Sequence, residues 1–151
     1  PRGLGNLAPT ARTAITRGGP SAPVRALVGK RLVRGRVLDY GSGRGEDVAW
    51  LRSQGLQVTA YDPHHGPKRK PTGSYDTILV TYVLNVLPAK AQTELVRAVR
   101  ELLAPGGRVL LTARTDTCPA PATGVQTCVT AVAGGKVVAS GGGFKTWELR
   151  R

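Results

Sequence analysis

A glycine-rich turn and a distant aspartate form the clearest candidate binding site in this sequence. The segment VLDYGSGRG (residues 37–45) carries Asp39 at the end of an apolar run, followed by three glycines at alternating positions, Gly41, Gly43 and Gly45. Glycine lets a tight turn bring backbone groups close to a ligand without obstruction by a Cβ atom. Asp62 ends the next apolar segment, where a carboxylate can accept hydrogen bonds from ribose hydroxyls. The sequence has no GxGxxG spacing and no Walker lysine, which argues against a dinucleotide or a triphosphate.

These residues are positioned by short apolar segments that alternate with helical stretches, a pattern typical of a mostly parallel sheet. We expect strands at residues 37–40, 56–61, 76–82 and 108–113. We expect helices after the Ser21 cap, at residues 46–54, and from Pro88 to the stop at residues 105–107. The near-continuous apolar run at 76–82 predicts a strand buried on both faces, at the centre of the sheet.

The two remaining segments are less regular. Residues 63–74 contain three prolines and three consecutive bases, so they are expected to form an irregular loop. Near the end of the chain, residues 125–132 and 136–140 are expected to form an antiparallel hairpin around Gly134 and Gly135. A further strand is expected at 144–149.

Four ordered segments now resemble one family. VLDYGSGRG resembles motif I of class I SAM-dependent methyltransferases, and the strand ending at Asp62 resembles their second motif. SYDTILVTYVLNVLP resembles the family's fourth strand and following loop, and LLAPGGRVLLTAR resembles its helix–PGG–strand segment. The resemblance covers residues 36–114. It implies an α/β fold, a Rossmann-like three-layer sandwich with a mostly parallel sheet and an antiparallel C-terminal hairpin, with S-adenosyl-L-methionine (SAM) as cofactor.

Carried over position by position, the resemblance implies a set of cofactor-binding residues. The glycine turn lines the methionine end, Asp62 binds the ribose, and Thr81 lies near the sulfonium. The full expected set is Asp39, Tyr40, Gly41, Ser42, Gly43, Asp62, Pro63 and Thr81. The chain departs from the family between Asp62 and Asp76, where the third strand is expected to be shortened or absent. Part of the adenine wall must then come from the His64-His65 loop, a partner or the substrate.

The candidate catalytic residues are Tyr82, Asn85, His64 and His65. Methyl transfer from a sulfonium is an in-line displacement, so positioning of the nucleophile supplies much of the catalysis. A histidine could remove the acceptor's proton, although the two histidines equally fit a solvent-facing loop. Asn85 equally fits a cap of the turn before Pro88. The segment Tyr82–Asn85 lacks the Pro-Pro-aromatic tetrad of amino-methylating DNA enzymes, and no cysteine is placed for C5 chemistry.

The charge of the chain points toward a polyanionic partner. There are 22 Lys and Arg residues against 9 Asp and Glu, a formal net charge of +13. Residues 1–36 contain eight bases and no acid: Arg2, Arg12, Arg17, Arg25, Lys30, Arg31, Arg34 and Arg36. Together with Lys68, Arg69 and Lys70 they predict nucleic-acid contact. An arginine-rich composition would produce the same charge without such a partner.

Nucleic acid is therefore the first expected methyl acceptor, and the alternatives are a small molecule or a SAM-binding accessory protein without turnover. The segments TAITRGGPSAPVR, YDPHH and FKTWEL also resemble methyltransferases found beside DNA phosphorothioation genes. We expect a basic arm at residues 1–20 and a single domain at 21–151. The sequence has no long apolar span and no signal segment, so we expect a cytoplasmic protein without membrane contact. We also expect no bound metal, and we expect Cys118 and Cys128 to be reduced.

Overall fold

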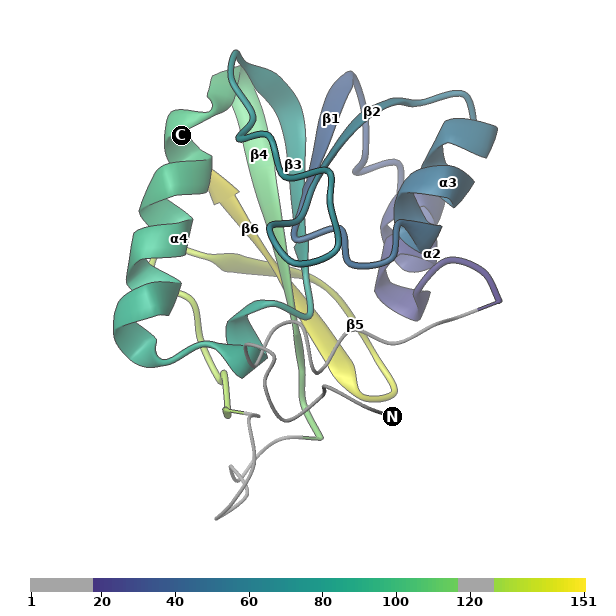
Figure 1. Ribbon diagram of the computed structural model, residues 1–151. Helices are drawn as coiled ribbons and strands as arrows, with labels where there is room; N and C mark the ends of the chain where they lie inside the picture. Colours follow the sequence, from purple (N-terminus) through teal and green to yellow (C-terminus); the bar gives the residue numbers. More distant parts are fainter. Residues whose placement is uncertain (1–17, 117–126) are drawn as a thin grey trace, which may run out of the picture.

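The computed structural model describes residues 18–116 and 127–151. Within them, a six-stranded sheet has the order β2-β1-β3-β4-β6-β5 (Figure 1). The first four of these strands run parallel, and β6 and β5 are antiparallel to their neighbours. Their bounds are β1 Arg36–Tyr40, β2 Gln57–Tyr61, β3 Tyr75–Thr81, β4 Leu103–Arg114, β5 Lys136–Gly141 and β6 Phe144–Arg150. This arrangement confirms the predicted α/β class and its antiparallel C-terminal strands.

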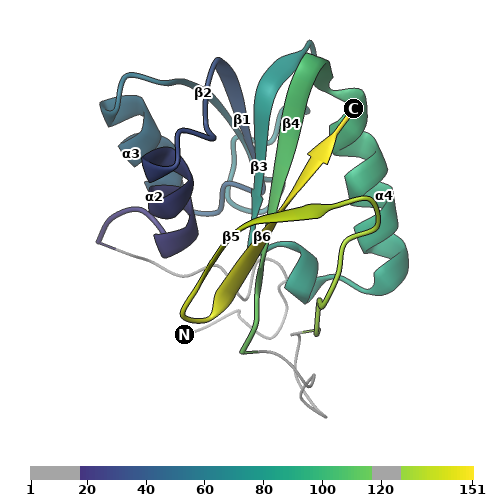
Figure 2. The same cartoon turned by 180° about the vertical axis from the view of Figure 1, so that it is seen from behind.

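Helices cover both faces of the sheet. On one face, α2 (Ala22–Gly29) and α3 (Glu46–Ser53) pack an apolar cluster that includes Leu27 and Leu51 (Figure 2). The other face is covered by α4 (Ala89–Glu101) and by residues after 126, including Val129. A short 3-10 helix, η2 (Leu84–Val86), lies between β3 and α4. The sheet is thus the middle layer of three.

The predicted central strand is confirmed by β3, which pairs with β1 on one side and β4 on the other. Its burial pattern is continuous over residues 77–80, as expected for a strand covered on both faces. The expected irregular loop is confirmed as well. Residues 62–74, all of which are described, contain neither helix nor strand and lead directly from β2 to β3. β2 is therefore the edge of the sheet on this side.

The predicted C-terminal hairpin is wrong in its pairing. Residues 127–135 contain no strand, and β5 pairs instead with β6 around a turn at Gly142 and Gly143. Gly143 has a φ of +95°, a conformation that favours glycine in a tight turn. The pairing lets β6 bury Trp147 and Leu149 in the core, which explains why this hairpin forms in place of the expected one.

Two smaller expectations also need correction. Helix α4 ends at Glu101, before Pro105, and β4 already begins at Leu103. The sequence overestimated the helix because Leu102 and Leu103 continue its apolar stripe. Cys128 is disulfide-bonded, so the expectation of a reduced thiol is wrong for this residue, and Cys118 lies outside the described residues. Within the described ranges, no helix has the length and apolar character needed to cross a bilayer.

Candidate active site

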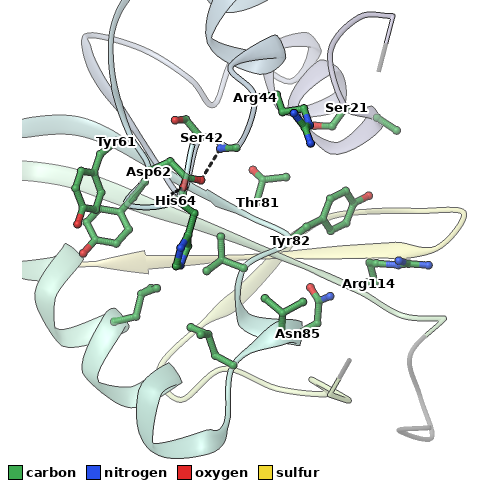
Figure 3. A pocket seen from close by; sticks show the side chains of 18 of the residues that line it. Ser21, Ser42, Arg44, Tyr61, Asp62, His64, Thr81, Tyr82, Asn85 and Arg114 are labelled. Atoms are coloured by element: carbon green, nitrogen blue, oxygen red, sulfur yellow. Dashed lines mark hydrogen bonds between the residues drawn. The ribbon is translucent and has the colours of Figure 1, made fainter. Parts of the chain in front are cut away.

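A cavity of about 670 Å³ lies at the carboxyl ends of β1, β2, β3 and β4 (Figure 3). Ligands of open parallel sheets bind at this end because the loops that follow the strands diverge there. A volume of this size is within the range of small-molecule and cofactor sites. The cavity brings the glycine turn after β1 together with the residues that end β2 and β3.

The glycine turn folds over the end of β2. The backbone N–H groups of Gly41 and Ser42 both donate to the carbonyl oxygen of Tyr61, over 2.7 and 3.0 Å. Gly41 has a φ of +89°, and a Cβ there would lie 2.7 Å from the Val83 side chain. The N–H of Gly43 donates to Asp62. These amides are satisfied within the protein, so the turn does not offer the row of free N–H groups that binds phosphates.

Asp62 holds the neighbouring loops in place. Its Oδ2 accepts the N–H of Gly43 at 2.8 Å, and its Oδ1 accepts the N–H groups of His64 and His65 at 2.8 and 3.0 Å. A carboxylate offers about four lone-pair sites, so Oδ2 keeps capacity for a further donor. The side chain lines the cavity, where that donor can be a hydroxyl of a bound ligand. Asp62 therefore has the geometry that a ribose-binding carboxylate needs.

Two tyrosines and a histidine form an aromatic wall beside Asp62. The rings of Tyr40 and Tyr61 lie 5.0 Å apart, tilted by 47°, and both line the cavity. Burial, and then the nearby Tyr61, raises the pKa of Tyr40, which keeps its phenol neutral. His64 points into the cavity below Asp62 (Figure 3). Sequence reasoning missed Tyr61; its position immediately before Asp62 was the available signal.

Two buried hydroxyl groups in the cavity bear on whether it fits SAM. Ser42 Oγ and Thr81 Oγ1 are buried and have no hydrogen-bond partner among the described residues. Buried polar atoms nearly always have hydrogen-bond partners in native proteins, so both hydroxyls indicate that a polar ligand forms hydrogen bonds with them. Both residues line the cavity, one at the glycine turn and one at the end of β3. A ligand with a charged amino-acid end and a ribose fits this donor set.

The loop after β3 forms the opposite side of the cavity. Tyr82 has a φ of +60°, which is unusual for an aromatic residue, and its N–H donates to Thr112 at 2.9 Å. Asn85 is only 1% exposed and lines the cavity. The Gln92 side chain braces this loop by donating to the carbonyl oxygens of Leu84 and Leu87, over 3.0 and 2.9 Å.

Buried hydrogen bonds between Ser21 and Asp47, which we call the clamp, support the third wall of the cavity. The backbone N–H and the hydroxyl of Ser21 donate to the two carboxylate oxygens of Asp47, over 2.6 and 2.9 Å. Ser21 is 2% exposed and Asp47 is 5% exposed. The clamp joins the start of α2 to the first turn of α3, and it thereby holds Pro20, Ser21 and Ala22 against the cavity. The sequence predicted a capping role for Ser21 and a first-turn position for Asp47, but not the hydrogen bonds between them.

The last residue of β4 is Arg114. Arg114 lines the cavity, and its Nε and Nη2 donate to both carboxylate oxygens of Asp116, over 2.9 and 2.7 Å. The hydrogen bond to Asp116 raises the pKa of Arg114 and lowers that of Asp116. Gly142 and Gly143 complete this end, where the Gly143 carbonyl accepts the N–H of Thr115 at 2.9 Å.

Most of the predicted site residues meet at this cavity. Ten of them line it: Tyr40, Gly41, Ser42, Gly43, Asp62, Pro63, His64, Thr81, Tyr82 and Asn85. Asp39 is buried behind the glycine turn, and His65 is half-buried outside the lining. Lys68, Arg69 and Lys70 are exposed on the loop to β3 and do not line the cavity. No group of three potential metal ligands occurs within the described ranges.

Comparison with known proteins agrees with this arrangement. Residues 14–149 match the family described as "Methyltransferase domain". The glycopeptide N-methyltransferase MtfA in complex with SAM has 16% identity and a TM-score of 0.63, over 89% of this chain and 88% of its own. The 1,6-didemethyltoxoflavin N1-methyltransferase of Burkholderia thailandensis has 18% identity and a TM-score of 0.61, over 99% and 82%.

A complex of DhpI with S-adenosylhomocysteine (SAH) has 22% identity and a TM-score of 0.57, over 84% of this chain and 82% of its own. At these identities the structures establish a shared fold. No curated protein matches the chain. The narrower resemblance to proteins encoded beside DNA phosphorothioation genes stays a prediction.

Proposed function

The chain belongs to the methyltransferase-domain family and is a SAM-dependent methyltransferase of Rossmann-like fold, and from this premise we propose that it methylates a small-molecule nucleophile. The observation that carries the proposal is the cavity at the carboxyl ends of the strands, walled on three sides and lined by buried hydroxyls. The solved structures of similar fold include N-methyltransferases of a glycopeptide and of a toxoflavin precursor, both small compared with a nucleic acid.

The chain's own residues divide the cavity into two ends. At the β1–β2 end, Asp62 would accept the ribose hydroxyls, and Tyr40 and His64 would contact the adenine. Between the two ends, Ser42 and Thr81 would hydrogen-bond the polar groups of the methionine portion. When bound, SAM supplies an electrophilic methyl group on a sulfonium. The proposed ribose contact follows from the remaining acceptor capacity of Asp62 Oδ2.

The β3–β4 end is the proposed acceptor site. There Tyr82, Asn85 and Arg114 line the cavity, Tyr82 just after β3, Asn85 in η2 and Arg114 at the end of β4 (Figure 3). In the proposed transfer, a nitrogen or oxygen lone pair of the acceptor would bond to the methyl carbon, and the electrons of the carbon–sulfur bond would stay with sulfur. Holding the two reactants in line supplies most of the acceleration, and the proton leaves to His64 or to water.

Nucleic acid is the second candidate acceptor, and the net charge of +13 favours it. Of the basic residues that the structure describes, only Arg44 and Arg114 line the cavity. A nucleic-acid substrate would therefore be held mainly by residues outside the cavity, with a single nucleotide reaching Tyr82.

The experiment follows methyl transfer from isotopically labelled SAM to a pool of small metabolites, to duplex DNA and to tRNA. We expect label in the small-molecule pool. Label confined to a nucleic-acid pool would replace the first acceptor with the second, and binding of SAM without transfer to any pool would refute turnover.

The role of Asp62 needs a test that separates ribose contact from its structural hydrogen bonds. We would compare adenosine with 2′,3′-dideoxyadenosine as competitors of SAH. The wild-type protein should prefer adenosine, and Asp62→Asn should lose that preference. Asp76→Asn is the matched control, because Asp76 also accepts a backbone N–H but lies at the other end of β3. An equal preference in Asp62→Asn and wild type would rule out the ribose contact.

A further inference from the structure

The end of the sheet opposite the cavity, where the parallel strands begin, gathers arginines from three separate segments. In the sheet register, Thr77 of β3 pairs with Arg108 of β4, and Arg108 pairs with Arg150 of β6. Arg34 joins the same line, because its N–H donates to Thr77 Oγ1 at 3.1 Å and its carbonyl accepts from that hydroxyl at 2.7 Å. Adjacent strands lie about 4.8 Å apart, so these guanidinium groups share one small area.

The positive charge there is only partly neutralised. Glu148 pairs with Arg108 at 2.9 Å and with Arg150 at 3.3 Å. Burial lowers the pKa of Arg108, and the nearby Arg34 and Arg150 lower it further while Glu148 opposes them. Among the described residues, no carboxylate forms an ion pair with Arg34, Arg36 or Arg151. The carboxylate of Asp76 accepts the backbone N–H of Arg36.

Several of these side chains are held in place by the fold. The Arg36 guanidinium lies 4.5 Å from the centre of the Tyr75 ring and donates to the Ser74 carbonyl at 3.1 Å. Arg151 donates to the Leu103 carbonyl at 3.0 Å. An arginine fixed in this way loses less conformational entropy when its remaining N–H groups bind an anion.

A shallow groove extends the charged area onto α4. It has a volume of about 480 Å³, and its lining includes Arg97, Arg100 and Arg151 with one acid, Glu101. The C-terminus lies beside the carboxyl end of α4 in both views (Figures 1 and 2). Arg151 lines this groove and directly follows Arg150 of the sheet end, so the two areas meet where β6 ends. We define the basic edge as Arg34, Arg36, Arg97, Arg100, Arg150 and Arg151.

We propose that this basic edge binds the phosphate backbone of nucleic acid. Arginine donates bidentate hydrogen bonds to phosphate, and release of counterions from the polyanion drives association. The edge is separated from the cavity by the seven residues of β3, about 20 Å. Nucleic acid bound here leaves the cavity open, so the edge docks the enzyme and is not its acceptor site. The inference stands whichever acceptor the cavity takes.

The test measures fluorescence anisotropy of a labelled DNA duplex over a series of salt concentrations. The variant is Arg34→Ala/Arg97→Ala on the full chain, because neither side chain makes a described hydrogen bond that folding would lose. We expect affinity at 0.1 M salt to fall roughly 10- to 100-fold, and the slope of log affinity against log salt to become shallower by about 1 to 2. A saturating duplex should leave SAH affinity unchanged.

The matched control removes two charges at the cavity end of the molecule. Lys90 lies in the first turn of α4, and Lys145 pairs with Ala113 near the end of β4. Lys90→Ala/Lys145→Ala should keep most of the affinity. Equal losses in both double variants would indicate general electrostatics and overturn the proposal. Loss only in Arg12→Ala/Arg17→Ala would move the contact to the N-terminal segment, and binding to phosphatidylserine vesicles but not to DNA would also overturn it.

Discussion

The clamp between Ser21 and Asp47 offers the sharpest test of how the cavity is built. In Asp47→Ala, two hydrogen bonds to a buried carboxylate disappear, each worth about 1.5–3 kcal/mol, so stability should fall by roughly 3–6 kcal/mol. Total stabilities of small domains are about 5–15 kcal/mol, so this variant risks unfolding. Asp47→Asn keeps the shape and one good acceptor, and it should cost only about 1–2 kcal/mol.

The functional effect follows from the position of the clamp. With one of the two hydrogen bonds lost, the segment Pro20–Ala22 is held less firmly against the cavity, and SAH affinity of Asp47→Asn should fall about tenfold, or 1.4 kcal/mol. Calorimetric titration with SAH measures the affinity, and denaturant unfolding measures stability separately. Asp76→Asn is the control, since the Asp76 carboxylate also accepts a backbone N–H, at an exposed position far from the cavity. If both variants bind SAH as tightly as wild type, the wall does not contribute to the site.

Three further predictions concern the aromatic wall, the loop after β3 and the sheet. The pKa of Tyr40 is raised above its ordinary value of 10.0, so the neutral phenol stabilises the fold below pH 10. This contribution is lost as the pH rises through the raised pKa. The free energy of unfolding of Tyr40→Phe should therefore depend less steeply on pH above pH 10 than that of wild type. Gln92→Ala should lower kcat while SAH affinity holds, with Thr93→Ala as a neutral neighbour. Glu148→Ala should cost about 3–5 kcal/mol in denaturant unfolding, because it leaves the buried Arg108 charge unpaired.

The fold could be predicted from sequence where local chemistry and burial agree. The run at residues 76–82 has no polar alternation, and only a strand covered on both faces buries it, so its central place followed directly. The prolines and glycines of residues 63–74 likewise left no room for a third strand. The C-terminal pairing could not be predicted in this way. The sequence offers residues 125–132 and residues 144–149 as partners for β5. The second segment forms the pair because its own pairing with β4 buries Trp147 in the core.

The candidate site divides along the same line. Gly41 and Asp62 are recognisable in sequence because the turn and the proposed ribose contact each require one residue type at one place. Ser21 and Asp47 are not, since their hydrogen bonds join residues far apart in the chain. The distribution of charge could be predicted only in part. The sequence by itself determined the excess of arginine, but only the tertiary structure decided that Arg34, Arg108 and Arg150 meet at the end of the sheet opposite the cavity. Strand register brings them together, and register is fixed by packing of the whole sheet.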